Sequence, residues 1–145
     1  MNRFLKAAID EAMKSKEQDE VPVGAVVVYK NKIIGRGHNE NNSKSVSNHA
    51  EINAINEAIN YINDWRLNDC ELYVTLEPCP MCAGAILKSR IKKVYIGTPS
   101  NIKSNHNIVE SIFKNKDFYN FVDYEYLNND YCSKILTDFF KEKRL

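Results

Sequence analysis

The stretch Pro78-Cys79-Pro80-Met81-Cys82, read together with His49-Ala50-Glu51, is the most informative part of this 145-residue sequence. The two segments supply one histidine, two cysteines and a carboxylate. A histidine and two thiolates can bind zinc and leave a fourth position open for water, which is the layout of a catalytic zinc site. Glu51 lies two residues from His49, where it can move protons on that water without binding the metal. The sequence therefore predicts a zinc site formed by His49, Cys79 and Cys82.

Both segments stand at the expected start of a helix, and this placement decides the fold around them. Proline is favoured at the first helical position, so Pro80 marks one helix start. Cys79 and Cys82 are three residues apart and share one face of that turn, near the positive helix end that favours thiolate. An apolar stripe marks a second helix over residues 50–62, directly after His49; it consists of Ile52, Ile55, Ile59 and Ile62. We expect the two helix starts to meet and assemble the three ligands.

Hydrophobic periodicity predicts further helices and strands along the rest of the chain. Helices are expected at residues 2–17, around 108–114 and at 129–143, and polar loops at 40–48 and 98–107. Strands are expected at 21–29, from Ile33 to His38 after the polar pair Asn31-Lys32, at 71–76, at 94–96 with Gly97 ending it, and at 121–126. The crossovers are long enough for parallel pairing after an initial hairpin. The pattern favours a three-layer α/β domain with a mixed sheet of about five strands.

Length and composition indicate one soluble domain over residues 1–145. The chain is 43% hydrophobic and 27% charged, which is ordinary for a globular protein. Its formal net charge of +1 provides no general basic excess, so contact with a nucleic acid must come from local patches. The first ten residues lack an apolar core like that of a signal peptide, and no apolar run reaches spanning length. We therefore expect a cytoplasmic protein that is not associated with a membrane.

Taken alone, the Cys-x-x-Cys pair also fits a redox pair or a structural zinc site, and His49-x-Glu51 alone is a weak pattern. A structural site needs a fourth protein ligand. The candidates for that ligand are Cys70, Cys132, His38 and His106. None of them belongs to a second ligand pair at the usual spacing, and we interpret the two remaining cysteines as small buried hydrophobic residues. The conjunction of the two segments favours a catalytic metal site.

Three further segments are candidates for contact with a substrate. Asn39, at the end of the expected second strand, offers an amide beside the site or merely ends the strand; both interpretations stay open. Gly24 permits a close backbone approach, which is compatible with a base lying flat on Val23. Phe139-Phe140 is either half core and half exposed, or an aromatic platform for a nucleotide beside the basic tail 141–144. The basic run 88–93 is interpreted as a solvated surface.

The two metal-binding segments form the known H-x-E…P-C-x-x-C signature of zinc nucleobase deaminases. Beyond that signature the chain resembles one family, the bacterial tRNA-specific adenosine deaminases of the cytidine deaminase superfamily. The resemblance runs from about Phe4 to Gly97 and resumes at the terminal helix. Its most specific stretches are EVPVGAVVV (20–28), NHAEINAI (48–55), DWRLNDCELYVTLEPCPMCAGAI (64–86), SRIKKVYIG (89–97) and LTDFFKEKR (136–144).

The resemblance implies a three-layer α/β/α cytidine-deaminase-like fold and hydrolytic deamination of the wobble adenosine of a tRNA anticodon to inosine. It implies that zinc-bound hydroxide attacks the base while Glu51 shuttles protons, and that the protein is a homodimer. One zinc ion per chain would be held by His49, Cys79 and Cys82. Val23, Asn39 and the backbone of Ala50 would line the adenine and ribose pocket, and Phe139 would hold a neighbouring base of the anticodon stem-loop.

The sequence departs from the family in two places. Residues 98–105 (TPSNIKSN) contain neither the acid nor the glycines that the family usually carries there, and Asn48 stands where a small residue is usual. The alternative enzyme is a deaminase of a free base or nucleoside, guanine or cytidine, with the same zinc site. A riboflavin-pathway deaminase usually spaces its cysteines more widely. A zinc-stabilised binding module would leave Glu51 without a role.

Overall fold

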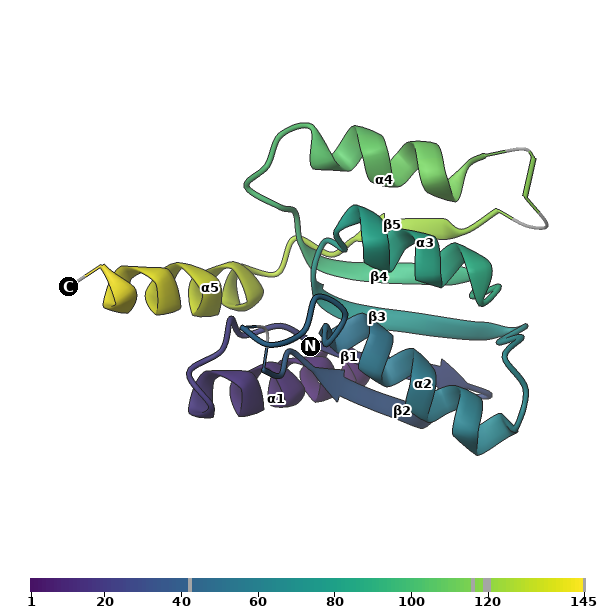
Figure 1. Cartoon of the computed structure of the whole chain (residues 1–145), viewed down its shortest axis with the longest axis horizontal. Coiled ribbons are helices and arrows are strands. Elements are labelled where there is room, and N and C mark those ends of the chain that lie inside the picture. Colours follow the sequence, from purple (N-terminus) through teal and green to yellow (C-terminus); the bar gives the residue numbers. More distant parts are fainter. Residues whose placement is uncertain (42, 116, 119–120, 145) are drawn as a thin grey trace.

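The computed structural model describes residues 1–41, 43–115, 117–118 and 121–144. Helices and strands alternate along this part of the chain (Figure 1). The helices are α1 (Arg3–Glu17), α2 (Ala50–Ile62), α3 (Pro80–Lys88), α4 (Asn105–Phe113) and α5 (Asp130–Lys143). The strands are β1 (Gly24–Tyr29), β2 (Lys32–His38), β3 (Cys70–Leu76), β4 (Lys93–Thr98) and β5 (Asp123–Tyr126).

The strands form one mixed sheet in the order β2-β1-β3-β4-β5. β1 is antiparallel to both of its neighbours, whereas β3, β4 and β5 run parallel. In Figure 1, α2, α3 and α4 lie over one face of the sheet, α1 lies behind it, and α5 extends past the end of the strands. This arrangement confirms the expected three-layer fold with a mixed sheet of five strands.

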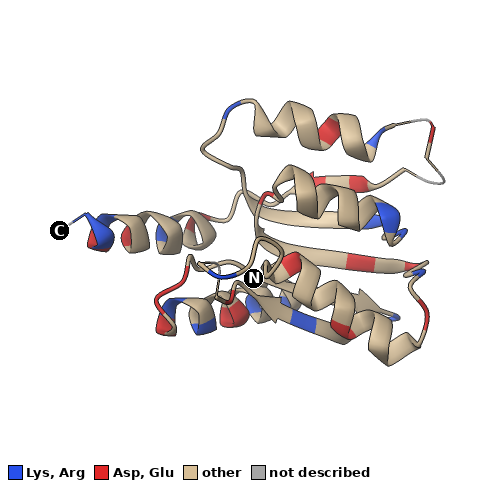
Figure 2. Ribbon diagram, viewed as in Figure 1, with Lys and Arg blue, Asp and Glu red and all other residues tan. Residues whose placement is uncertain are grey.

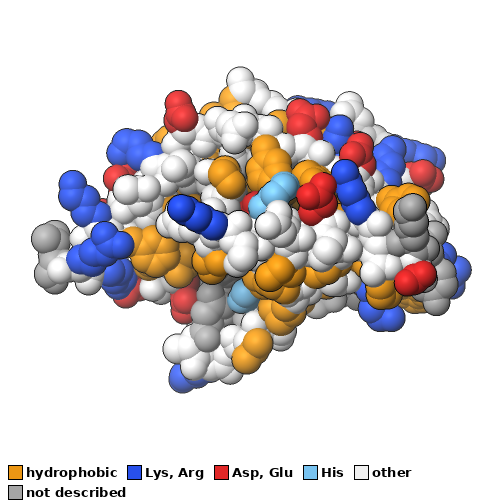
Figure 3. Space-filling model, turned by 90° about the horizontal axis from the view of Figure 1, so that it is seen from above, with side chains coloured by type: hydrophobic (Ala, Val, Ile, Leu, Met, Phe, Trp, Pro, Cys, Tyr) orange, Lys and Arg blue, Asp and Glu red, His pale blue; other side chains and the backbone are white. Residues whose placement is uncertain are grey.

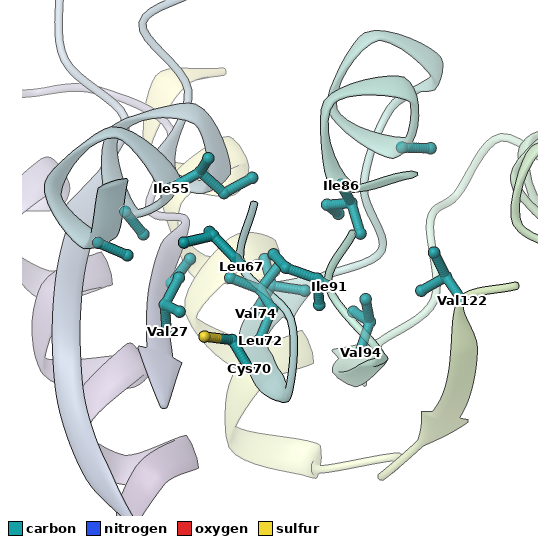
Figure 4. Close-up of a cluster of buried hydrophobic side chains, with 14 of the residues drawn as sticks. Val27, Ile55, Leu67, Cys70, Leu72, Val74, Ile86, Ile91, Val94 and Val122 are labelled. Atoms are coloured by element: carbon teal, nitrogen blue, oxygen red, sulfur yellow. The ribbon is translucent and has the colours of Figure 1, made fainter. Parts of the chain in front are cut away.

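The sheet separates two hydrophobic cores, and alternate residues of β1 serve one core each. Val27 joins the larger core, while Val26 and Val28 join the smaller core under α1. Figure 4 shows Ile55 and Ile86 of the larger core reaching from the helices towards the sheet. Because burial of each such side chain contributes about 1.5–3 kcal/mol, these contacts hold α2 and α3 against the strands.

The place of Gly97 and the turn between β1 and β2 differ from the sequence-based expectation. Gly97 lies inside β4 and does not end the strand. A Cβ atom there would lie 2.6 Å from Cys132 Sγ and 2.7 Å from the Thr75 carbonyl oxygen, so the glycine allows close packing. The hairpin turns at Lys30 and Asn31, both with positive φ, and Lys32 already belongs to β2. Positive φ at both central residues is the geometry of a tight two-residue hairpin turn.

Three element boundaries also shift. β1 begins at Gly24 and not at residue 21, and β5 begins at Asp123 and not at residue 121. α4 begins at Asn105, three residues before the expected start, inside the segment that was expected to be loop. The start of α4 is set by tertiary contacts: the Asn105 side chain is buried and hydrogen-bonded to Glu77 and Pro78, which a local sequence pattern does not reveal.

Within the described residues, no helix is long and apolar enough to cross a membrane.

Gly37 permits a close approach between the start of α2 and the sheet. A Cβ atom on Gly37 would lie 2.3 Å from the Ala50 carbonyl oxygen and 2.5 Å from the Ala54 nitrogen. Real Cβ atoms do not come so close to backbone atoms, so any side chain at this position would push the start of α2 away from β2. The start of α2 carries His49 and Glu51 on either side of Ala50.

The substitution Gly37→Ala should therefore lower the free energy of unfolding by about 1–3 kcal/mol, the usual cost of overpacking. Gly84→Ala is the matched control, because a Cβ atom there meets nothing within 4 Å. Replacing glycine by alanine inside a helix should raise stability by up to about 1 kcal/mol. Urea unfolding measures both, and a Gly37→Ala protein as stable as the unaltered chain would contradict the close contact.

Candidate metal centre

The side chains of His49 and Cys79 project from the starts of two helices. His49 is the N-cap residue of α2 and Cys79 that of α3, and neither side chain caps its own helix. Cys82 lies in the first turn of α3 and is fully buried. Pro80 is the first residue of α3, as the sequence predicted. Extended backbone at both N-cap positions turns the two ligand side chains off the helix ends and towards each other.

The distances among the three side chains fit a single zinc ion. His49 Nδ1 lies 3.7 Å from Cys79 Sγ and 3.5 Å from Cys82 Sγ. All three ligand atoms lie within 4.8 Å of one another. Tetrahedral zinc with bonds of about 2.3 Å to sulfur and about 2.1 Å to nitrogen separates the two atoms by about 3.6 Å. The donor set, one imidazole and two thiols, is also one that zinc prefers.

A hydrogen bond joins the two candidate thiol ligands, Cys79 and Cys82. A hydrogen bond from Cys82, aided by the backbone amides of Met81 and Cys82, lowers the pKa of Cys79 to about 5. The same hydrogen bond, together with burial, raises the pKa of Cys82 well above its usual range. These shifts favour the thiolate form at Cys79 and the thiol form at Cys82. Because a metal binds thiolates, it must displace the Cys82 proton.

Glu51 is a buried carboxyl group beside the three ligands. It lies in the first turn of α2 and is 3% exposed. Burial, reinforced by the nearby Cys79, raises the pKa of Glu51 to about 7. A carboxyl group with such a pKa takes up and releases protons near neutral pH, as a general acid and base requires.

Val23, Asn39 and Ala50 are brought together at the end of the sheet. Asn39 Oδ1 accepts a hydrogen bond from the Ala50 N–H at 2.9 Å, and the Asn39 N–H donates to the Val23 carbonyl at 3.2 Å. Among the described residues, Asn39 Nδ2 has no hydrogen-bond partner. This amide group remains available to a ligand, whereas the Ala50 N–H is already engaged.

The other histidines and cysteines have different surroundings. Cys70 and Cys132 are fully buried, and burial raises the pKa of each to about 11, as expected of small core residues. His38 Nδ1 lies 3.1 Å from Glu11 Oε1, and His106 Nδ1 lies 2.8 Å from the Tyr126 hydroxyl. In the described ranges of the chain, no fourth side chain joins the three candidate ligands. Three protein ligands without a fourth are what a catalytic zinc site would require, because such a site keeps one position open.

A pocket of about 560 Å³ lies at the ends of β3 and β4. Its lining residues are Val21, Leu76, residues 98–102, Ser133, Leu136, Thr137, Phe140 and Arg144. Phe139 is 5% exposed and belongs to the interior, whereas Phe140 is 40% exposed and lines the pocket. Phe140 is therefore the accessible ring of the pair. Leu76 was missed from the sequence as a pocket residue; the signal that could have found it is that parallel strands such as β3 and β4 end at one edge of the sheet.

Comparison with known proteins agrees with this geometry. The family model of MafB19-like deaminases matches residues 1–144. The tRNA-specific adenosine deaminase of Buchnera aphidicola is 40% identical, over 97% of this chain and 94% of its own length. The corresponding protein of Aquifex aeolicus is 42% identical with the same coverage.

Two solved structures show similar folds. One, from a study of A-to-I editing by tRNA:A34 deaminases at the wobble position of transfer RNA, matches with a TM-score of 0.82 and 34% identity. That match covers 92% of this chain and 99% of the other. The guanine deaminase of Bacillus subtilis matches with a TM-score of 0.66 and 29% identity, over 100% and 96% of the two chains. The chain therefore belongs to the deaminases and, within them, to the family of the tRNA-specific adenosine deaminases.

Proposed function

We propose that this chain, as a single deaminase domain over residues 1–145, converts adenosine to inosine at the wobble position of a tRNA anticodon. The observation that carries the proposal is the convergence of His49, Cys79 and Cys82 beside the buried carboxyl group of Glu51. The near-full-length similarity to tRNA-specific adenosine deaminases supports tRNA as the substrate. A tRNA substrate in turn supports a cytoplasmic location.

The chemistry is divided between one zinc ion and Glu51. When bound, zinc acts as a Lewis acid that lowers the pKa of a water molecule at the open fourth position. Glu51 would take one proton from the water as its oxygen bonds to the carbon that carries the amino group, and would pass this proton to a ring nitrogen of the base. It would then take the second proton from the new hydroxyl group and give it to the amino group as the C–N bond breaks, so that the products are a carbonyl group and ammonia. Burial of Glu51 keeps bulk water from competing for these protons.

The pocket at the strand ends supports an RNA substrate. The target base would lie on Val23, with its nucleoside held by Asn39 Nδ2. Figure 2 shows Lys and Arg at the free end of α5, and Figure 3 shows hydrophobic surface beside basic side chains at that end. A neighbouring base can stack on Phe140 while Arg144 meets a phosphate. Bases in a hairpin loop are already unpaired, so their extrusion costs less than from a duplex.

We also propose that the protein is a homodimer, in which a second chain enlarges the basic surface that a net charge of +1 leaves small. Light scattering at working concentration tests this directly.

Purified protein should contain one zinc ion per chain by elemental analysis. Cys82→Ala should abolish zinc binding, while Cys132→Ala, which also removes a fully buried thiol, should retain it. Because the pKa of Cys82 is raised, zinc binding should release a proton and become tighter as the pH rises. Zinc retained by the Cys82→Ala protein would refute the assignment of the ligand.

Glu51→Gln should keep zinc but lower kcat by about 10²–10⁴-fold, the usual contribution of a positioned proton-transfer group. Glu57→Gln, an exposed position on the same helix, serves as the control and should leave kcat nearly unchanged. Single-turnover assays on an anticodon stem-loop, with zinc measured in parallel, separate the two effects. An active Glu51→Gln protein would exclude the proposed proton shuttle.

Substrate choice is tested by offering an anticodon stem-loop with a wobble adenosine, free adenosine, guanine and cytidine to the same preparation. Inosine should form in the stem-loop, and Phe140→Ala should raise KM for it by about 5- to 150-fold, since base stacking contributes about 1–3 kcal/mol. Tyr131→Ala, on the same helix and 45% exposed, is the control outside the pocket. Preference for guanine or cytidine would establish the alternative deaminase in place of the tRNA enzyme.

A further inference from the structure

A chain of hydrogen bonds joins the loop before Cys79 to α4 and β5. Its centre is Glu77, which is 4% exposed and lies two residues before Cys79. Glu77 Oε1 accepts a hydrogen bond from the Tyr126 hydroxyl at 2.5 Å, and Glu77 Oε2 accepts one from Asn105 Nδ2. These partners come from β5 and from the first residue of α4.

Asn105 holds the backbone as well as the carboxylate. Its amide nitrogen also donates to the Pro78 carbonyl oxygen at 3.0 Å, so both amide hydrogens are used. Both partners are acceptors, which dictates the orientation of the amide. The Pro78 carbonyl belongs to the peptide group that continues into Cys79 N. Fixing that peptide plane fixes the position from which the Cys79 side chain departs.

His106 extends the chain of hydrogen bonds to the surface. The Tyr126 hydroxyl has one hydrogen, which it gives to Glu77, so the hydrogen bond of 2.8 Å with His106 Nδ1 must be donated by the histidine. Burial and the hydrogen bond to Glu77 raise the pKa of the Tyr126 hydroxyl, which keeps it a donor. The His106 side chain is 45% exposed.

Glu77 and Asn105 also hold both ends of the loop over residues 98–105, part of which lines the pocket. The Glu77 N–H donates to the Thr98 carbonyl at 2.9 Å, where the loop begins. The Asn105 side chain reaches Glu77 and Pro78 where the loop ends. Residues 99–102, between these two anchors, line the pocket together with Phe140.

Glu77 depends on these hydrogen bonds because it is a buried carboxylate. Among the residues that the structure describes, no Lys, Arg or His lies within ion-pair distance of it. A buried charge without a counter-charge is tolerated only when hydrogen bonds satisfy its oxygens. Loss of either donor would leave one Glu77 oxygen without a hydrogen bond. The segment that leads into Cys79 would then shift to satisfy that oxygen.

We propose that Asn105 and Tyr126 are positioning residues for the metal ligand Cys79, acting through Glu77 and Pro78, and that they tie the pocket-lining loop to the metal centre. The proposal rests on the zinc site proposed above. Groups that orient metal ligands by hydrogen bonds, without touching the metal, typically contribute about 10–100-fold to metal affinity or activity.

The test is the rate at which purified zinc-loaded protein loses zinc to an excess of a chromophoric chelator. Asn105→Ala should lose zinc about 10–100-fold faster than the unaltered chain, and Tyr126→Phe should change the rate in the same direction. The matched controls are Asn107→Ala, exposed on the same helix, and Tyr124→Phe, two residues away on the same strand. Both controls should stay within about twofold, because neither side chain is hydrogen-bonded to Glu77 or Pro78.

A second readout separates positioning from general stability. Cobalt(II) in place of zinc reports ligand geometry through its absorption bands, which should shift in Asn105→Ala and Tyr126→Phe and not in the controls. Glu77→Gln keeps an acceptor for Asn105 and should lose metal more slowly than Glu77→Ala. Variants that hold zinc as long as the unaltered chain, with unchanged cobalt spectra, would overturn the inference and leave the proposed function standing. An unaltered chain that binds no zinc would instead overturn the zinc centre itself.

Discussion

The close contact between β2 and the first turn of α2 is the constraint on which the metal centre depends. At Gly37 the backbone of α2 packs directly on the strand, with no side chain between them. Two residues further along the chain, the Asn39 side chain accepts a hydrogen bond from the Ala50 N–H. The residues on either side of Ala50 are His49 and Glu51. The proposed metal ligand and the proposed proton carrier are therefore fixed relative to the sheet itself, which is more rigid than a loop. Rigid placement of such groups is what differential binding of a transition state requires.

Negative charge accumulates around the candidate metal centre, and the positive ends of α2 and α3 partly offset it. Each helix N-terminus is equivalent to roughly half a positive charge, and the Cys79 thiolate and the Glu51 carboxyl group both lie near one. The directions of the pKa shifts show that this compensation is incomplete. The pKa of Cys79 is lowered, but the pKa values of both Cys82 and Glu51 are raised, so these two groups hold their protons more tightly than they would in water. A divalent cation bound by the three side chains would supply the missing charge and favour the thiolate form of Cys82.

The residues that could be predicted from the sequence are those whose position depends on local signals. Pro80 marks a helix start by itself, and the apolar stripe of α2 places His49 without knowledge of the rest of the fold. Asn105 carries no such signal, because its role comes from Glu77, 28 residues away, and it was assigned to a loop. Gly97 was read as a strand end, although the reason for a glycine there is the approach of Cys132 from α5. Polar contacts over long sequence separations have no period, so sequence patterns do not predict them.

The loop over residues 98–105 departs from the family pattern, and the structure shows what it has instead of glycines and an acid. It is held at one end through the Thr98 carbonyl and at the other through Asn105, and both anchors converge on the segment that carries Cys79. An RNA base that enters the pocket meets a loop already fixed to the metal centre. Less conformational entropy is then lost on binding than with a glycine-rich loop, which has more freedom to lose. If zinc and RNA bind as proposed, selectivity at the rim and geometry at the metal would consequently depend on the same carboxylate, Glu77.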